Sequence, residues 1–198
     1  MKVQHLPALI VALTAAVIAM AAPANAQTNV LIMNEERIIA ESQVGQHIST
    51  RMQAIRAEMD GELQALLTPI QEESDRLNAE TASLTPEAIQ ARPDLMQRIQ
   101  TLNAQAQQAE ALRQRLAQEL QATQRQAMRP VLEALQAVLQ EVVSERGAQI
   151  LIDRSAVVYA DPAIDVSDSV IERLNQRLPT TAVNRVRLPQ GEQQPAQQ

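Results

Sequence analysis

The stretch that decides the fold is residues 51–84, which reads RMQAIRAEMDGELQALLTPIQEESDRLNAETASL. Apolar side chains recur in it at spacings of three, four and seven, as in a helix that packs lengthwise against a partner helix. Pro69 lies inside this pattern, removes one main-chain donor and is predicted to act as a hinge in the helix. The apolar positions are Met52, Ile55, Met59, Leu63, Leu66, Ile70, Leu77 and Leu84.

A second helical stretch follows two proline-marked breaks, at Thr85-Pro86 and at Arg92-Pro93. A proline disfavours helical geometry in the residue before it and fits the first position of a new helix. The second long helix is predicted from about Leu95 to Arg146, and Gly147 ends it. Two long helices joined by a short tip form an antiparallel hairpin. Residues 46–129 are therefore predicted to form a helical arm.

Charge and length agree with this hairpin. Residues 46–85 carry three Arg and seven acidic residues, whereas residues 95–129 carry five Arg and two acidic residues. Opposite charges favour pairing of the two helices, although solvent and salt screen exposed pairs. Forty helical residues extend about 60 Å at about 1.5 Å per residue. The arm should therefore project from a smaller body.

The body is predicted from both ends of the folded chain, residues 27–45 and 130–180. Strand-like apolar segments occur at 28–33, 149–153 and 156–159, and a final helix follows near 167–178. The fold class is therefore mainly α with a small β-containing body. So small a body with one aromatic residue is marginal alone, and association would cover its strand edges. The predicted oligomer interface comprises Val30, Leu31, Ile32, Ile150, Leu151, Ile152, Val157, Val158 and Tyr159.

Both termini are predicted to lie outside this body. Residues 1–26 combine Lys2, an apolar run at 8–22 and an Ala24-Asn25-Ala26 end, the layout of a signal peptide cleaved after Ala26. That run is shorter than the roughly 20 residues that a membrane span needs. The sequence thus predicts export to the periplasm without stable membrane insertion. The Gln- and Pro-rich residues 181–198 are predicted to be disordered.

Composition disfavours most enzymes and nucleic-acid partners. The formal charge is −6 and aromatic residues make up 1% of the chain, so a nucleic acid would find neither a basic surface nor stacking platforms. With no Cys and two His, the chain has few zinc ligands and no thiol nucleophile. It also lacks a glycine-rich phosphate loop. We expect no catalytic site, no metal and no cofactor.

The arrangement resembles the Skp or OmpH-like family of periplasmic chaperones. The residues that carry the resemblance are 30–34 and 42–45 near the start, and 147–153, 155–162 and 165–175 near the end. The resemblance implies a homotrimer whose arms enclose a cavity. It also implies an ATP-independent holdase for unfolded outer-membrane β-barrel proteins. Arms in the family are basic and Lys-rich, whereas the only lysine here is Lys2, which does not favour binding to anionic membranes.

Two interpretations of the arm stay open. In the first, Met52, Met59 and Met96 offer adaptable contacts to a client chain; coiled-coil packing of these methionines is the competing interpretation. Leu67 and Ile89 lie off the stripe and are candidates for the cavity wall. In the second interpretation, the chain is a periplasmic spacer or adaptor whose coiled coil bridges two folded partners.

Overall fold

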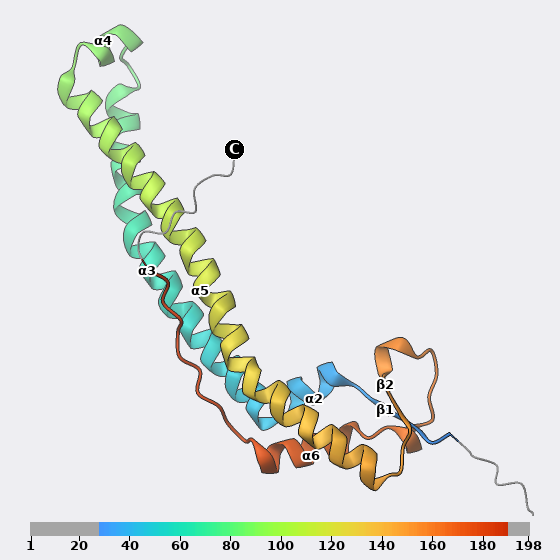
Figure 1. Cartoon of the computed structure of the whole chain (residues 1–198). Coiled ribbons are helices and arrows are strands. Elements are labelled where there is room, and N and C mark those ends of the chain that lie inside the picture. The colour runs from blue at the N-terminus through green and yellow to red at the C-terminus, as the bar shows by residue number, and fades with distance from the viewer. Residues whose placement is uncertain (1–27, 190–198) are drawn as a thin grey trace, which may run out of the picture.

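The chain forms a small body that carries one long helical arm (Figure 1). The structure is a computed structural model that describes residues 28–189, so the predicted signal peptide and residues 190–198 lie outside it. In chain order the elements are β1 (Val30–Met33), α2 (Glu35–Glu41), α3 (Gln43–Thr81), α4 (Pro86–Gln90), α5 (Pro93–Glu145), β2 (Ile150–Asp153), η2 (Arg154–Ala156), η3 (Pro162–Ile164) and α6 (Ser167–Arg177). The predicted fold class is confirmed.

The arm consists of α3 and α5, which run antiparallel and meet at a tip that holds α4 (Figure 1). Helix α3 continues through Pro69, so the hinge at this residue stays a prediction. At its start, Ser42 caps α3 by accepting a hydrogen bond from the Gly45 N–H. Both long helices also extend into the body, because α3 begins at Gln43 and α5 reaches Glu145. The predicted arm boundaries at 46 and 129 therefore coincide with no helix end.

Two strands from opposite ends of the chain pair in the body. Strand β1 is parallel to β2, with Val30 opposite Ile150 and Met33 opposite Asp153. Residues beyond the strands add to this junction: the Val166 N–H donates to the Ile32 carbonyl oxygen over 2.9 Å. A parallel pair needs a long crossover connection, and here the whole arm supplies it. The arm is thus inserted between two segments that fold together.

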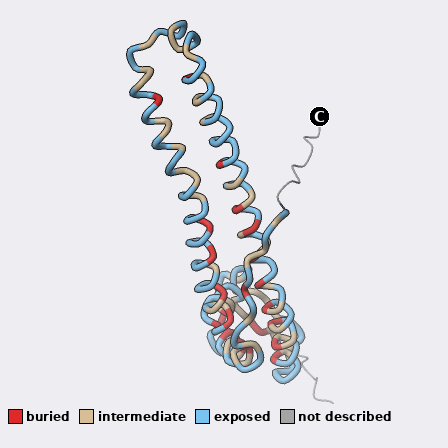
Figure 2. The backbone as a smooth tube through the Cα atoms, turned by 90° about the vertical axis from the view of Figure 1, so that its left-hand side faces the viewer, coloured by how far each residue is buried: buried red, intermediate tan, exposed pale blue. Residues whose placement is uncertain are grey.

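Apolar packing is concentrated where the arm enters the body. Figure 2 shows buried positions gathered at that end and sparse toward the tip. On α5 the buried residues Val131, Leu135, Val138 and Val142 follow the helical period and face the body. They pack with Ile38 of α2 and with Val170 and Leu174 of α6 in one cluster.

Two glycines have specific structural roles. At Gly45, in the first turn of α3, a Cβ atom would lie 1.7 Å from the Ile39 carbonyl oxygen, so the close approach of α2 and α3 requires glycine. Gly147 has a φ of 59° and follows the end of α5, as the sequence predicts.

The predicted strand at 156–159 is wrong. The Asp153 carboxylate accepts hydrogen bonds from the Ser155 N–H and hydroxyl, and this contact turns the chain into η2 directly after β2. Val158 and Tyr159 then lie in an exposed loop, with 106% and 80% relative exposure. The sequence predicted the end of β2 at Asp153, but the apolar run at 156–159 did not reveal that the chain stays in a loop after η2.

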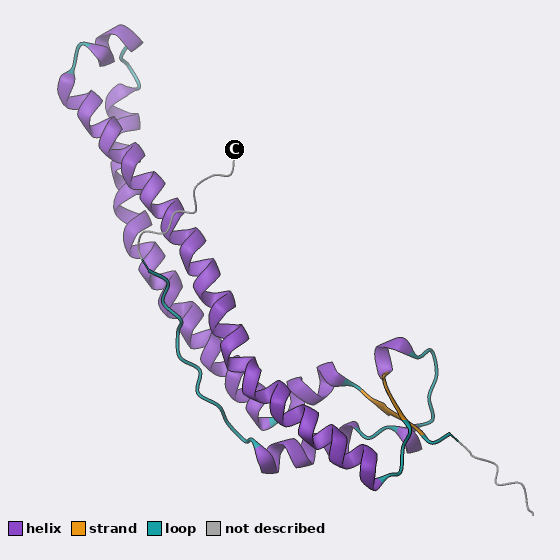
Figure 3. Cartoon of the chain, viewed as in Figure 1, coloured by secondary structure: helices purple, strands orange, loops and turns teal. Residues whose placement is uncertain are grey.

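The predicted disorder of residues 181–189 is also wrong. After α6 the chain runs back along the arm as an extended segment, residues 179–189, which we call the C-terminal strap (Figure 3). Val183 is buried in the main apolar cluster, and Arg185 contacts both arm helices. The prediction of disorder rested on composition, which contains no information about partners that are distant in the sequence.

Within residues 28–189, no helix is both long enough and apolar enough to cross a membrane.

Candidate functional site

The arm is thinly packed over its distal half. On α3, Ile55 and Met59 are buried near the body, and the next buried residue toward the tip is Leu77. On α5, only Ala109 is buried between Leu95 and Leu116. Some residues of the seam between the helices are small, and the buried residues are far apart along each helix. Much of the arm's apolar surface is therefore half-exposed. Such a surface suits weak, adaptable contacts better than one tight pocket.

The tip is built by local capping signals that the sequence predicts correctly. The Thr85 hydroxyl accepts a hydrogen bond from the Ala88 N–H at the start of α4, and Pro86 occupies the first turn. Pro93 then starts α5. These two restarts turn the chain within a short distance and fix where the arm ends.

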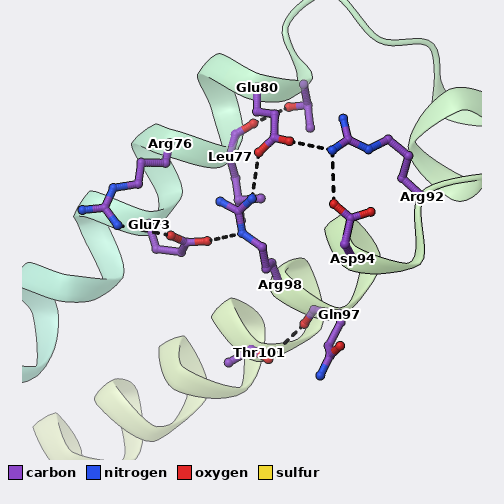
Figure 4. Close-up of polar contacts among 10 residues, drawn as sticks. Glu73, Arg76, Leu77, Glu80, Arg92, Asp94, Gln97, Arg98 and Thr101 are labelled. Atoms are coloured by element: carbon purple, nitrogen blue, oxygen red, sulfur yellow. Dashed lines mark hydrogen bonds and ion pairs between the residues drawn. The ribbon is translucent and has the colours of Figure 1, made fainter.

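A chain of ion pairs joins the two helices just below the tip (Figure 4). Arg98 of α5 contacts Glu73 and Glu80 of α3, each over 2.7 Å. Arg92 contacts the same Glu80 over 2.9 Å and Asp94 over 3.1 Å. The α3 carboxylates and the Arg residues before and within α5 follow the charge difference seen in the sequence.

These pairs shift the acidity of the carboxylates involved. Hydrogen bonds from Arg98, with a further contribution from Arg92, hold the pKa of Glu80 below its ordinary value. The hydrogen bond from Arg92 likewise lowers the pKa of Asp94. All of these side chains reach solvent, so each pair contributes little to stability on its own. They join α3 to α5 in a part of the arm where buried apolar residues are few.

The predicted client-contacting residues divide into two groups. Met59 is buried in the seam between the arm helices. The competing interpretation, coiled-coil packing, therefore applies to Met59, and its assignment as a client contact is corrected. Met52, Leu67, Ile89 and Met96 are only partly buried. Met52 lies near the body and lines a surface hollow with Ile48, Arg56 and Gln124. Ile89 in α4 and Met96 in the first turn of α5 lie at the tip.

The predicted oligomer-interface residues also divide. Leu31 and Ile32 are buried within the single chain, so they pack its own body rather than face outward. Ile150, Val158 and Tyr159 are exposed, as is Leu132 of α5. An apolar hollow on the body is lined mainly by residues of β1, α5 and β2, among them Met33, Leu132, Leu139 and Leu151, with Glu35 of α2 at its side.

One polar cluster on the arm was not predicted from the sequence. Glu119 and Thr123 of α5 are buried, with 2% and 1% relative exposure, and both accept hydrogen bonds from the strap. Glu62 of α3 contacts Arg185 of the strap. The available signal was a glutamate beside the apolar stripe of α5 together with the apolar residues Val183, Val186 and Leu188 near the C-terminus.

Within residues 28–189, no group of three or more His, Asp or Glu side chains is placed to hold a metal ion. The aspartates after β2 have other partners. Asp161 accepts from the Ala163 N–H, Asp165 accepts from Ser167, and Asp168 pairs with Arg37.

A small β-containing body that carries one long helical hairpin places the chain in a class of arm-bearing, mainly helical proteins. The family model described as outer membrane protein (OmpH-like) matches residues 29–174, and the chain belongs to this family of outer-membrane chaperones. The family resemblance that the sequence indicated is confirmed.

Two relatives illustrate the similarity. The chain is 23% identical over 159 residues to the chaperone protein Skp of Yersinia enterocolitica, a match that covers 79% of this chain and 93% of that protein. The crystal structure of an OmpH-like protein from Caulobacter crescentus is 27% identical, with a TM-score of 0.68, and the match covers 96% of this chain and 99% of that one. Both relatives are described as chaperones.

Proposed function

We propose that this protein is an ATP-independent holdase of the periplasm that binds unfolded outer-membrane β-barrel proteins and prevents their aggregation. The observation that carries the proposal is the projecting arm, whose sparse seam leaves apolar side chains such as Leu67, Ile89 and Met96 only partly buried. Many weak contacts of this kind hold an unfolded chain through their number. Membership of the OmpH-like chaperone family supports the same function.

The proposal includes a homotrimer whose three arms surround the client. Support comes from the body, where Ile150, Val158 and Tyr159 are exposed next to the paired strands. Apolar side chains in such positions are typical of surfaces that become covered on association. The layout of residues 1–26 as a signal peptide supports export to the periplasm.

A dilution assay tests the holdase. A urea-denatured outer-membrane β-barrel protein is diluted into buffer with and without the purified chain, and light scattering follows aggregation. Suppression at a trimer excess is the expected result, and it should not require nucleotide. Unchanged scattering at that excess would refute the proposal. If the chain instead captures one folded partner and ignores denatured barrels, the spacer or adaptor interpretation replaces it.

A matched pair of variants locates the contacts. Leu67→Ser with Ile89→Ser removes apolar surface from the arm, whereas Gln64→Ser with Gln90→Ser changes exposed polar residues on the same helices. The first pair should weaken suppression of aggregation, and the second should act as the unmodified chain does. Equal activity of both pairs would place the client contacts elsewhere.

A further inference from the structure

The arm holds the strap through contacts that do not depend on the strap's side chains. The Val186 N–H donates to the Thr123 hydroxyl over 2.9 Å, and the Leu188 N–H donates to the Glu119 carboxylate over 3.1 Å. In an extended chain, the N–H groups of residues two apart point to the same side. The two acceptors on α5 therefore engage one edge of an extended main chain, whatever its sequence.

The Thr123 hydroxyl is oriented for this contact by its own helix. It donates its only proton to the Glu119 carbonyl oxygen over 2.7 Å, which leaves its lone pairs to accept from the strap. The acceptor is thus set by α5 itself and does not need the strap to orient it.

A second element of the site selects a cation. Arg185 donates to Glu119 over 2.9 Å through Nε, and its terminal nitrogens contact Glu62. Its side chain is only 8% exposed, so this pair is largely withdrawn from water. An ionised carboxylate as buried as Glu119 is costly without close charged partners. Arg115 on the same helix lies 3.7 Å away, so the closer pair, at 2.8 Å, comes from Arg185. The site therefore favours a chain that supplies an arginine.

A third element is apolar. Val183, two residues before Arg185, is buried in the main cluster with Ile55 and Met59 of α3. The contacts together specify an apolar side chain, an arginine two positions later, and main-chain N–H groups after the arginine that are free to donate to α5. The strap lies after residue 174, where the match to the family model ends, so the family match does not account for it.

We propose that Glu62, Glu119 and Thr123 form a binding site for an extended polypeptide segment with an arginine two residues after an apolar side chain, and that the strap occupies this site in cis until such a segment displaces it. Barrel strands alternate apolar and polar residues, which makes residues two apart alike, so the expected source is a stretch of an unfolded barrel outside this alternation, such as a loop or a strand end. This inference rests on the proposed function only for the source of the segment. The site itself is defined by the arm and the strap.

Peptide binding to the full chain tests the site. The probe is a fluorescently labelled peptide with the sequence of residues 179–189, and fluorescence anisotropy measures its binding. The tethered strap has an effective concentration near the millimolar range, so the unmodified protein should bind the probe weakly. Arg185→Glu in the protein places a negative charge against Glu62 and Glu119 and should release the strap. This variant should bind the probe at least about tenfold more tightly.

Two further variants keep the test specific. Val186→Pro removes the N–H that Thr123 accepts and should also expose the site, without any change of charge. Adding Glu119→Gln to Arg185→Glu should abolish the gain in probe binding, because the buried carboxylate that pairs with the arginine is lost. Arg129→Glu, which changes an exposed arginine paired with Glu133 on the same helix, should behave as the unmodified protein does.

Each result has a defined meaning. Tighter probe binding in both release variants, lost with Glu119→Gln, supports the site. Equal probe binding in unmodified and release variants overturns it, as does tight binding that survives Glu119→Gln. The aggregation assay on the unmodified protein is read separately. If the protein suppresses aggregation but does not bind the probe, the holdase proposal stands and this site is rejected. If it binds the probe but does not suppress aggregation, the site stands and the holdase proposal is rejected.

Discussion

Arg185 and Glu119 lie 66 positions apart in the chain, yet the Arg185 Nε atom is 2.9 Å from a Glu119 carboxylate oxygen. The same guanidinium contacts Glu62 on the other arm helix. One side chain of the strap therefore links both helices of the arm at a level where the apolar seam begins to thin. The part of the arm beyond this link is held by buried residues such as Leu77, Leu95 and Ala109 together with the ion pairs below the tip.

Replacing Arg185 with alanine should lower the free energy of unfolding by about 2 kcal/mol, because Glu119 then keeps only the more distant Arg115, at 3.7 Å, as a charged partner among the described residues. The loss should fall below the full cost of an unpaired buried charge, since the strap can leave and admit water. Urea denaturation followed by circular dichroism measures the change. Arg129→Ala removes an exposed pair and should change stability by less than about 0.5 kcal/mol. Equal effects of the two variants would contradict a structural role for the strap.

Acid should weaken the strap. The hydrogen bond from Arg185 holds the pKa of Glu62 below its ordinary value of 4.5. A carboxyl group with a lowered pKa in the folded state stabilises the fold above the unfolded pKa, and this contribution disappears as the pH falls through the folded pKa. Stability should thus decline as the pH drops below about 4.5. Glu62→Gln should flatten part of this decline in urea titrations between pH 7 and pH 3. An unchanged slope would rule out this linkage.

Gly45 and Gly61 offer a matched test of the turn between α2 and α3. Gly45→Ala places a Cβ atom against the Ile39 carbonyl oxygen and should destabilise the protein by about 1–3 kcal/mol. Gly61 has nothing within 4 Å of the same position, so Gly61→Ala should stabilise α3 by about 0.5–1 kcal/mol. Thermal unfolding of both variants shows whether each substitution raises or lowers the stability of the protein. A stabilising Gly45→Ala would show that the two helices separate easily.

The ion pairs at the tip should act locally. Arg98→Ala removes the contacts to Glu73 and Glu80 and should speed hydrogen exchange of amides near the tip. Global stability should change by less than about 1 kcal/mol, because the pairs reach solvent. Arg113→Ala, whose partner Glu110 lies one turn away on the same helix, is the control and should leave exchange at the tip unchanged. Similar exchange in both variants would show that the tip does not depend on these pairs.

Local signals in the sequence predicted the helix ends well. Pro86 begins α4, Pro93 begins α5, and Gly147 follows α5 with a positive φ. Each of these features depends on a few neighbouring residues, so the sequence contains the information needed. The helical period of 51–84 likewise predicted that α3 would pack along a partner.

The errors arose where a distant or polar contact overrides a local pattern. Asp153 turns the chain after β2, so the apolar residues at 157–159 form a loop instead of a strand. The strap has the composition of a flexible tail, but Arg185 finds two carboxylates on the arm. No pattern within residues 181–189 identifies partners at Glu62 and Glu119. The client contacts and the oligomer interface stay predictions, because they involve other chains.

Val158 provides the most direct test of the proposed oligomer. Its side chain is fully exposed in the single chain, so Val158→Asp removes no internal packing and should leave the helical content unchanged. If the loop is covered on association, a buried unpaired carboxylate should weaken assembly by at least about tenfold. Mass from light scattering over a range of concentrations measures this, and Gln108→Asp on the exposed arm is the matched control. A mass that matches the control at every concentration would place the contact between subunits away from this loop.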